Sequence, residues 1–168
     1  MPLLLAHHHR DTEGVGSASP MISRAVNCAY RLVLRVAYPI LDHLERTFGI
    51  RSNVAMVAVW HGDRLLMVRH SYRHGDALPG GMVGAGESPA EAAARELHEE
   101  VGVCVRPDEL IFVRSWRQLR THTWLFEYRP SAAPRITPDQ REVVSARFVG
   151  ADSIPRSMRW MLAKRRRW

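Results

Sequence analysis

Residues 81–103 read GMVGAGESPAEAAARELHEEVGV and carry the most informative pattern in the sequence. Ser88, Pro89 and Glu91 have the spacing of a capping box with proline in the first turn, which starts a helix. Gly102 stands where a left-handed residue commonly ends one. Between these signals an apolar stripe follows at helical spacing, made of Ala90, Ala94, Leu97 and Val101. The stretch therefore predicts an amphipathic helix that is entered from a glycine-rich loop.

Another face of this helix carries Glu96, Glu99 and Glu100 at spacing i, i+3, i+4. Like charges at these spacings repel by roughly a few tenths of a kcal/mol per pair, and a helix built only for stability avoids them. A hard divalent cation removes the conflict, because Mg²⁺ binds carboxylate oxygens together with substrate phosphates. The pattern indicates a metal-assisted site. The alternative is a solvated acidic face.

The charge of the whole chain fits the same interpretation. The net charge is +7, from 24 basic and 17 acidic residues, and Lys164 is the one lysine among them. Residues 81–103 hold five glutamates and one arginine, a net charge of −4, so the other residues carry +11. An acidic patch in a basic protein suits a divalent cation that serves a polyanionic substrate. A basic surface that only maintains solubility is the alternative.

The spacing of residues 81–103 is Gly-x5-Glu-x7-Arg-Glu-Leu-x-Glu-Glu-x-Gly-Val, which matches every fixed position of the Nudix box. The chain therefore resembles the Nudix hydrolase superfamily, over about residues 51–155. The resemblance implies an α+β fold: a Nudix-type α/β/α sandwich with a mixed β-sheet, here preceded by an extra N-terminal amphipathic helix. It also implies a MutT-like, divalent-metal-dependent hydrolase of a pyrophosphate bond in a nucleoside diphosphate linked to another group, with Mg²⁺ or Mn²⁺ as cofactor.

By motif position, the resemblance also implies which residues hold the metal. The expected ligands are the three glutamates Glu96, Glu99 and Glu100 and the main-chain carbonyl of Gly81. Arg95 precedes Glu99 by four residues and is expected to orient a glutamate by charge-assisted hydrogen bonding. Three further residues in or beside the box are expected to support the site: Glu87, Gly80 and Gly102.

A fourth catalytic carboxylate is expected from a loop beyond the box. Glu142, which precedes an apolar run at residues 143–149, is the first candidate, and Asp139 is the second. A divalent metal lowers the pKa of a bound water, and a carboxylate then removes the remaining proton. Glu96 and Glu142 are both candidates for this base.

The identity of the substrate stays open. We expect a small nucleotide-type diphosphate and no specific nucleic acid, with Arg69 and Arg73 as substrate-binding residues. Trp116 and Trp124 are candidates for stacking on a base, with burial in the core as the alternative. Narrower alternatives are an oxidised nucleotide or a capped RNA. Broader ones are an inactive Nudix-fold regulator that binds nucleotides, and a hydrolase of a non-nucleotide diphosphate such as a diphosphoinositol.

Upstream of this region, apolar residues recur at three- and four-residue steps from residue 22 to residue 48 and predict an amphipathic helix. Pro39 is expected to kink or divide this helix, and Gly49 to end it. Charged residues interrupt it too often for a membrane span. We expect the helix to pack on the domain that follows or on a second copy, so a homodimer is one alternative. Contact with a membrane surface is another.

The expected organisation has three parts. Residues 1–20, rich in glycine and serine, are expected to be a disordered tail, residues 21–50 a helical extension, and residues 51–168 the Nudix hydrolase domain. The run Met1–Leu5 is too short for a signal-peptide core, and Cys28 and Cys104 form no metal-type pair. These features exclude a disulfide-stapled secreted domain, and we expect a cytoplasmic protein.

Apolar runs on both sides of the acidic helix predict the β-strands. The expected strands lie at residues 54–60, 64–69, 110–115, 121–128 and 143–149. A turn is expected at Gly62-Asp63, a loop at residues 78–81, and a C-terminal helix from residue 154 to residue 168.

Overall fold

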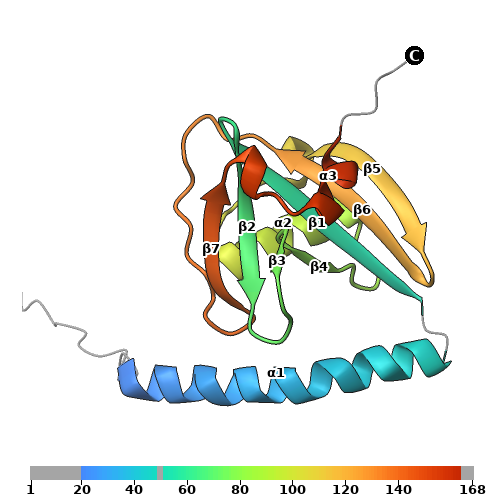
Figure 1. The fold of residues 1–168 in the computed structure, drawn as a ribbon, viewed down its shortest axis with the longest axis vertical. Coiled ribbons are helices and arrows are strands. Elements are labelled where there is room, and N and C mark those ends of the chain that lie inside the picture. Colours follow the sequence, from blue (N-terminus) through green and yellow to red (C-terminus); the bar gives the residue numbers. More distant parts are fainter. Residues whose placement is uncertain (1–19, 49–50, 164–168) are drawn as a thin grey trace, which may run out of the picture.

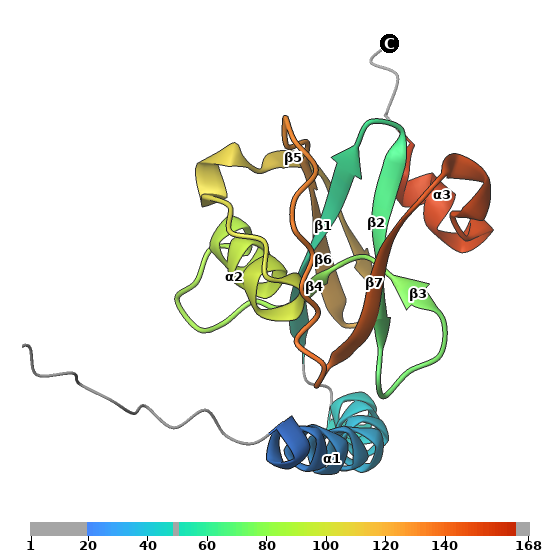
Figure 2. The same ribbon diagram turned by 90° about the vertical axis from the view of Figure 1, so that its left-hand side faces the viewer.

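The computed structural model describes residues 20–48 and 51–163. A mixed sheet lies between two helices, α2 (Pro89–Val101) and α3 (Arg156–Leu162), which cover its opposite faces (Figure 2). A long helix, α1 (Pro20–Phe48), lies across one end of the sheet (Figure 1). The structure is thus the predicted α/β/α sandwich with an N-terminal helix before it.

The sheet has the strand order β3-β2-β1-β6-β5, while β4 pairs with β1 and β7 pairs with β2. Strands β1 and β6 run parallel along their length, and all the other pairs are antiparallel. Two short 3-10 turns, at Pro107–Glu109 and Ala151–Ser153, complete the described elements. The strands are β1 (Ser52–His61), β2 (Arg64–His70), β3 (Asp76–Ala77), β4 (Gly80–Met82), β5 (Ile111–Gln118), β6 (Thr121–Tyr128) and β7 (Val143–Val149).

The strands contribute side chains to two hydrophobic cores, because successive side chains point to opposite faces of a sheet. One core lies under α2 and includes Val57, Val59, Leu66, Val68, Leu97 and Val101. The other lies toward α3 and includes Ala58, Leu65, Met67, Ile154 and Met158. Burial of Leu97 and Val101 fixes the rotation of α2, and with it the direction of its glutamates.

Helix α1 contacts the domain through its polar side. Nε and Nη2 of Arg31 donate to the main-chain carbonyl of Gln140, at 2.9 and 2.7 Å, and Nε of Arg35 donates to that of Ser71 at 2.9 Å. The apolar stripe faces away: Leu32 is 65% exposed and Val33 is 62% exposed. The helix therefore lies against the domain as expected, but arginine side chains make the contact.

Some local predictions were wrong. The helix α1 is not divided at Pro39, because a proline removes one hydrogen bond from the ladder and the rest of a 29-residue helix remains. Gly80 and Gly81, predicted as part of a loop, belong to strand β4, with Ala55 opposite Gly81 and Met56 opposite Gly80. The C-terminal helix spans only Arg156–Leu162.

Two predictions fall partly outside the described residues. The predicted tail extends over residues 1–20, of which 1–19 are not described, and residues 164–168 of the predicted C-terminal helix are not described either. None of the helices in the described ranges combines the length and the apolar composition that a membrane span requires.

Gly80 allows β4 to approach β1 closely. Its φ is +147°, and a Cβ at this position would lie 2.2 Å from the carbonyl oxygen of Ala55 and 2.7 Å from the Cα of Met56. Both atoms belong to the backbone of a central strand, so they do not move aside as the end of a side chain does. Only glycine fits there without displacing the backbone.

We therefore expect Gly80→Ala to lower the free energy of unfolding by about 2–4 kcal/mol. Gly150→Ala is the matched control, because Gly150 has φ −75° and no atom within 4 Å of the added Cβ. It should change the free energy by less than about 0.5 kcal/mol. Urea denaturation followed by circular dichroism measures both variants. An equal effect of the two substitutions would contradict the close approach of β4 to β1.

Candidate active site

The caps of α2 agree with the sequence pattern. The main-chain N–H of Glu91 donates to Ser88 Oγ at 3.2 Å, and that of Ser88 donates to Glu91 Oε2 at 2.8 Å. Gly102 has φ 72°, and its N–H donates to the main chain of the last turn. Both ends of the helix are thus fixed, and Glu91 is engaged in the capping box away from the other glutamates.

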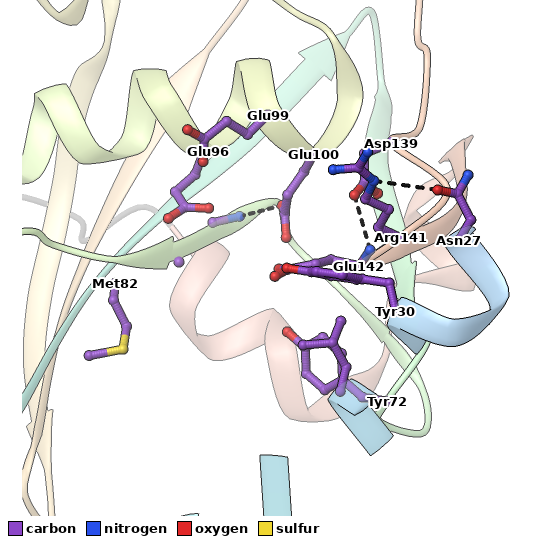
Figure 3. A pocket seen from close by; sticks show the side chains of 13 residues that line it. Asn27, Tyr30, Tyr72, Met82, Glu96, Glu99, Glu100, Asp139, Arg141 and Glu142 are labelled. Atoms are coloured by element: carbon purple, nitrogen blue, oxygen red, sulfur yellow. Dashed lines mark hydrogen bonds between the residues drawn. The ribbon is translucent and has the colours of Figure 1, made fainter. Parts of the chain in front are cut away.

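A cavity of about 730 Å³ lies beside α2 (Figure 3). Strand β4 contributes Gly80, Gly81 and Met82 to it, and helix α1 contributes Asn27, Tyr30 and Leu34. Tyr72 and Arg141 also line it. Five carboxylates face this one space: Glu96, Glu99, Glu100, Asp139 and Glu142. The fold therefore brings together the three expected glutamate ligands, Gly80 and Gly81, and both candidates for the fourth carboxylate.

Arg95 connects three of the carboxylates around the site. Its Nη1 donates to Glu96 Oε1 at 2.7 Å and to Glu99 Oε2 at 3.0 Å. Its Nε and Nη2 donate to the two carboxylate oxygens of Glu87, at 2.9 and 3.1 Å, and Nη2 also donates to the main-chain carbonyl of Met82 at 2.9 Å. Arg95 thus joins the glycine-rich loop, β4 and α2.

These bonds shift the pKa of both partners. The pKa of Arg95 is raised, first by its hydrogen bonds to Glu87 and then by Glu96 and Glu99, which outweigh its partial burial. The pKa of Glu87 is lowered, first by Arg95 and then by the N–H of Gly84. Glu87 therefore supports the site through Arg95, and it is not among the residues that line the cavity.

Glu100 is buried, with 4% of its side chain exposed, and two donors hold it. The N–H of Gly80 donates to Oε2 at 2.9 Å, and Nε2 of His70 lies 2.8 Å from Oε1. Nδ1 of His70 faces Nε of Arg73 at 3.2 Å. A guanidinium only donates, so Nδ1 presents its lone pair to Arg73 and Nε2 carries the proton that bonds Glu100.

Two carboxylates in the cavity have a raised pKa. Burial raises the pKa of Glu96, with additions from Glu100 and Glu99 and partial compensation by Arg95. Burial also raises the pKa of Glu142, with additions from the charges of Glu100 and Asp139. Burial is thus the main reason that these two carboxylates hold a proton more readily than a solvated carboxylate.

Asp139 shapes the loop that carries Glu142. Its Oδ2 accepts from the N–H of Glu142 at 3.0 Å, and its Oδ1 accepts from the N–H of Val143 at 2.8 Å. Figure 3 shows Glu142 in the cavity across from the glutamates of α2. Both oxygens of Asp139 are therefore engaged by the main chain, which favours Glu142 as the fourth carboxylate.

The donor set fits a hard divalent cation, because carboxylate and main-chain carbonyl oxygens are the ligands such ions prefer. A Cβ on Gly81 would lie 2.4 Å from the carboxylate of Glu96, so glycine is what allows this side chain to lie against the main chain. Arg95 uses one oxygen of Glu96 and one of Glu99, which leaves the second oxygen of each. Across the described ranges, no three acidic, histidine or cysteine side chains already form a ready metal cluster.

Other predicted residues lie elsewhere. Arg69 and Arg73 line a separate pocket of about 560 Å³ that adjoins α1. Trp116 packs edge-to-face against Trp160, with 5.0 Å between ring centroids, and Trp124 lies on His122, with 3.7 Å between centroids. Neither tryptophan lines the cavity with the carboxylates.

The sequence interpretation missed the residues that α1 brings to the site. Tyr30 and Tyr72 are the aromatic side chains beside the carboxylates, and Tyr30 also lies under the guanidinium of Arg141, 5.8 Å from the ring centroid. The available signal was the face of α1 opposite its apolar stripe, where Asn27, Arg31 and Leu34 recur at helical spacing. No spacing along the chain links His70 to Glu100.

Comparison with known proteins indicates the same family as the Nudix box at residues 81–103. The family model described as "NUDIX domain" matches residues 49–167. The RNA pyrophosphohydrolase of Francisella philomiragia is 39% identical over 69 residues, which cover 41% of this chain and 43% of that protein. The chain thus matches less than half the length of this curated relative.

Solved structures share the fold. The MutT NUDIX hydrolase from Burkholderia pseudomallei has a TM-score of 0.56 and 18% identity, with coverage of 70% of this chain and 99% of that chain. The bifunctional NMN adenylyltransferase/ADP ribose pyrophosphatase from Francisella tularensis, solved with AMP and a manganese ion, has a TM-score of 0.51 and 21% identity, with coverage of 77% and 43%. The chain belongs to the Nudix hydrolase family, with its NUDIX domain at residues 49–167.

Proposed function

We propose that the chain is a divalent-metal-dependent pyrophosphohydrolase that acts on a nucleoside diphosphate linked to another group. The observation that carries this proposal is the convergence of Glu96, Glu99, Glu100 and Glu142 on one cavity. The curated RNA pyrophosphohydrolases support the reaction class, and the manganese ion of the Francisella tularensis structure supports a divalent cofactor. Mg²⁺ is the proposed metal, with Mn²⁺ as the alternative.

The proposed ligands are Glu96, Glu99 and Glu100 of α2 and the main-chain carbonyl of Gly81. When bound, a divalent cation neutralises phosphate oxygens and lowers the pKa of the attacking water. The chain itself supplies the positioning: Arg95 orients Glu96 and Glu99, while His70 and the N–H of Gly80 orient Glu100.

Hydrolysis forms one bond from the water oxygen to phosphorus and breaks the bridging P–O bond, and the water proton must pass to a base. A carboxylate with a raised pKa accepts a proton more readily than an ordinary one. Both Glu96 and Glu142 have this property. We propose Glu142 as the base, because Glu96 already binds Arg95 and so its proton affinity is partly offset.

A second candidate substrate is the 5′-polyphosphate end of an RNA. The names of the curated relatives favour it, as does the basic pocket beside the carboxylates. A turnover screen with Mg²⁺ across nucleoside di- and triphosphates, ADP-ribose, dinucleotides, diphosphoinositols and a 5′-triphosphorylated oligoribonucleotide separates the two candidates. The products to follow are inorganic phosphate, pyrophosphate and nucleoside monophosphate.

We expect Glu99→Gln to reduce turnover by about 10²-fold or more, because one metal-binding charge is removed. Glu99 is the sharpest position for this test. Its side chain is 57% exposed and bonds only to Arg95 in the described structure, so the fold should not depend on it. In Glu100→Gln, by contrast, an amide nitrogen would face the N–H of Gly80 or of His70. Turnover and thermal melting should be measured on the same preparations.

Glu91→Gln is the control for the loss of one carboxylate from α2, since Glu91 belongs to the capping box. It should lower the melting temperature and leave turnover close to that of the wild type. Equal activity of Glu99→Gln and the wild type at saturating Mg²⁺ would sink the catalytic assignment.

The raised pKa of Glu142 predicts a pH-dependent change in stability. Its pKa is higher in the folded chain than in the unfolded chain, so the ionised group costs stability at neutral pH and the cost disappears as the pH falls through the folded pKa. In EDTA, Glu142→Gln should therefore be more stable than the wild type at about pH 8 and lose this advantage by about pH 4.

Glu91→Gln should behave in the opposite way, because hydrogen bonds from Ser88 lower the pKa of Glu91. This variant should be less stable than the wild type at pH 8, and the difference should shrink as the pH falls. Urea denaturation at several pH values measures both variants. A Glu142→Gln variant whose relative stability does not change with pH would contradict the raised pKa.

A further inference from the structure

A second pocket, of about 560 Å³, lies between α1 and residues 69–75. Four arginines line it, Arg31 and Arg35 from α1 and Arg69 and Arg73 from β2 and the loop after it. None of the described residues that line this pocket is acidic. Four guanidinium groups around one space repel one another, and an anion in that space would relieve the repulsion. We call this space the arginine pocket.

The four arginines are held in position by part of their hydrogen-bonding capacity. Arg31 donates to Gln140 and Arg35 to the main-chain carbonyl of Ser71. Arg69 donates to Asp76 Oδ1, and Arg73 to Nδ1 of His70. A guanidinium carries five N–H donors, and these bonds use one to three of them in each case. The remaining donors suit a phosphate group, which accepts from arginine in forked geometry.

The arginine pocket adjoins the cavity that contains the carboxylates. Tyr72 lines both spaces. The polar side of α1 also runs past both, with Tyr30 and Leu34 on the cavity and Arg31 and Arg35 on the arginine pocket. A ligand bound at the carboxylates can thus extend along α1 into a region of opposite charge.

We propose that the arginine pocket is a second anion site, which binds phosphate groups of the substrate that lie outside the cleaved pyrophosphate bond. This inference rests on the proposed function, because it assumes that the cleaved bond lies at the carboxylates. It makes α1 part of the substrate site, although α1 precedes the NUDIX domain at residues 49–167. The substrate then carries at least one phosphate more than the diphosphate that is hydrolysed.

Such a phosphate has two sources, the sugar–phosphate chain of an oligonucleotide or the polyphosphate of a small molecule. Tyr72 and His74 stand beside the arginines, and single-stranded nucleic acids are commonly bound by basic grooves with aromatic side chains. The experiment therefore includes both kinds of ligand.

The test is direct binding in EDTA, where no hydrolysis is expected and the outcome does not depend on catalysis. The probe is a short 3′-labelled, 5′-triphosphorylated single-stranded oligoribonucleotide, followed by fluorescence anisotropy, with inorganic tripolyphosphate as competitor. Arg35→Gln and Arg69→Gln remove one arginine from each side of the arginine pocket. Arg24→Gln is the matched control, because Arg24 lies on the same helix, is exposed and lines neither space.

We expect Arg35→Gln and Arg69→Gln each to weaken binding about fivefold or more at low salt. For the oligonucleotide, the slope of log K against log [salt] should fall in magnitude by about 0.7 for each phosphate that the variant no longer neutralises. Arg24→Gln should change affinity by less than about twofold. If Arg35→Gln loosens α1, Arg69→Gln still tests the arginine pocket, because Arg69 lies on β2. Circular dichroism reports the helix content of both variants.

Two ligands besides the probe, tripolyphosphate and a 5′-hydroxyl oligonucleotide, identify the source of the phosphate. If tripolyphosphate displaces the probe and its own affinity depends on Arg35 and Arg69, the arginine pocket binds a polyphosphate. If a 5′-hydroxyl oligonucleotide binds as well as the probe with the same dependence, the pocket binds the nucleic acid chain. If neither ligand depends on Arg35 or Arg69, or Arg24→Gln has an equal effect, the proposal is overturned. Failure of the proposed function would appear separately, as unchanged turnover in Glu99→Gln.

Discussion

The guanidinium of Arg95 donates to Glu87 on the glycine-rich loop, to Glu96 and Glu99 on α2, and to the main chain of β4 at Met82. The helix glutamates at this spacing repel one another, and Arg95 is the cation that holds two of them beside the cavity. The guanidinium groups of Arg95 and Arg141 do not balance five carboxylates. Burial raises the pKa of Glu96 and that of Glu142, and the charges of neighbouring carboxylates raise them further. A divalent cation would complete the compensation, which is why the chemistry of the site points to metal-assisted hydrolysis.

A second set of contacts ties the site to the sheet. Glu100 is buried between the N–H of Gly80 on β4 and the imidazole of His70 on β2. Buried charges are stable only with such partners. Because Arg73 in turn bonds His70, the contacts run from the arginine pocket to the carboxylate cavity. The carboxylate cavity and the arginine pocket are therefore connected by side-chain contacts, although the first suits a cation and the second suits an anion.

The parts of this arrangement that depend on local spacing could be predicted from the sequence. The caps of α2 at Ser88 and Gly102 follow from short-range rules, and so does the shared face of Glu96, Glu99 and Glu100. The strands at residues 121–128 and 143–149 have the bounds that their apolar alternation predicts.

The parts that depend on contacts between distant residues could not be predicted in this way. Gly80 looks like a loop residue until β1, about 25 positions earlier, is placed beside it. His70 and Glu100 are 30 positions apart. The periodicity of α1 reveals two faces, but hydrogen bonds from Arg31 and Arg35 to main-chain carbonyls decide which face meets the domain. Local sequence patterns predict the elements and their faces. Contacts with residues distant in the sequence decide which of those faces packs on the domain.

The measurement that tests the central claim most directly is a titration of the chain with Mn²⁺, in which electron paramagnetic resonance reports the free ion. If the carboxylates beside Arg95 form a divalent metal site, the wild type binds at least one Mn²⁺ per chain, Mg²⁺ competes for it, and Glu96→Gln weakens the binding by about tenfold or more. Mn²⁺ binding that is absent at millimolar concentration, or that Glu96→Gln leaves unchanged, would contradict the account.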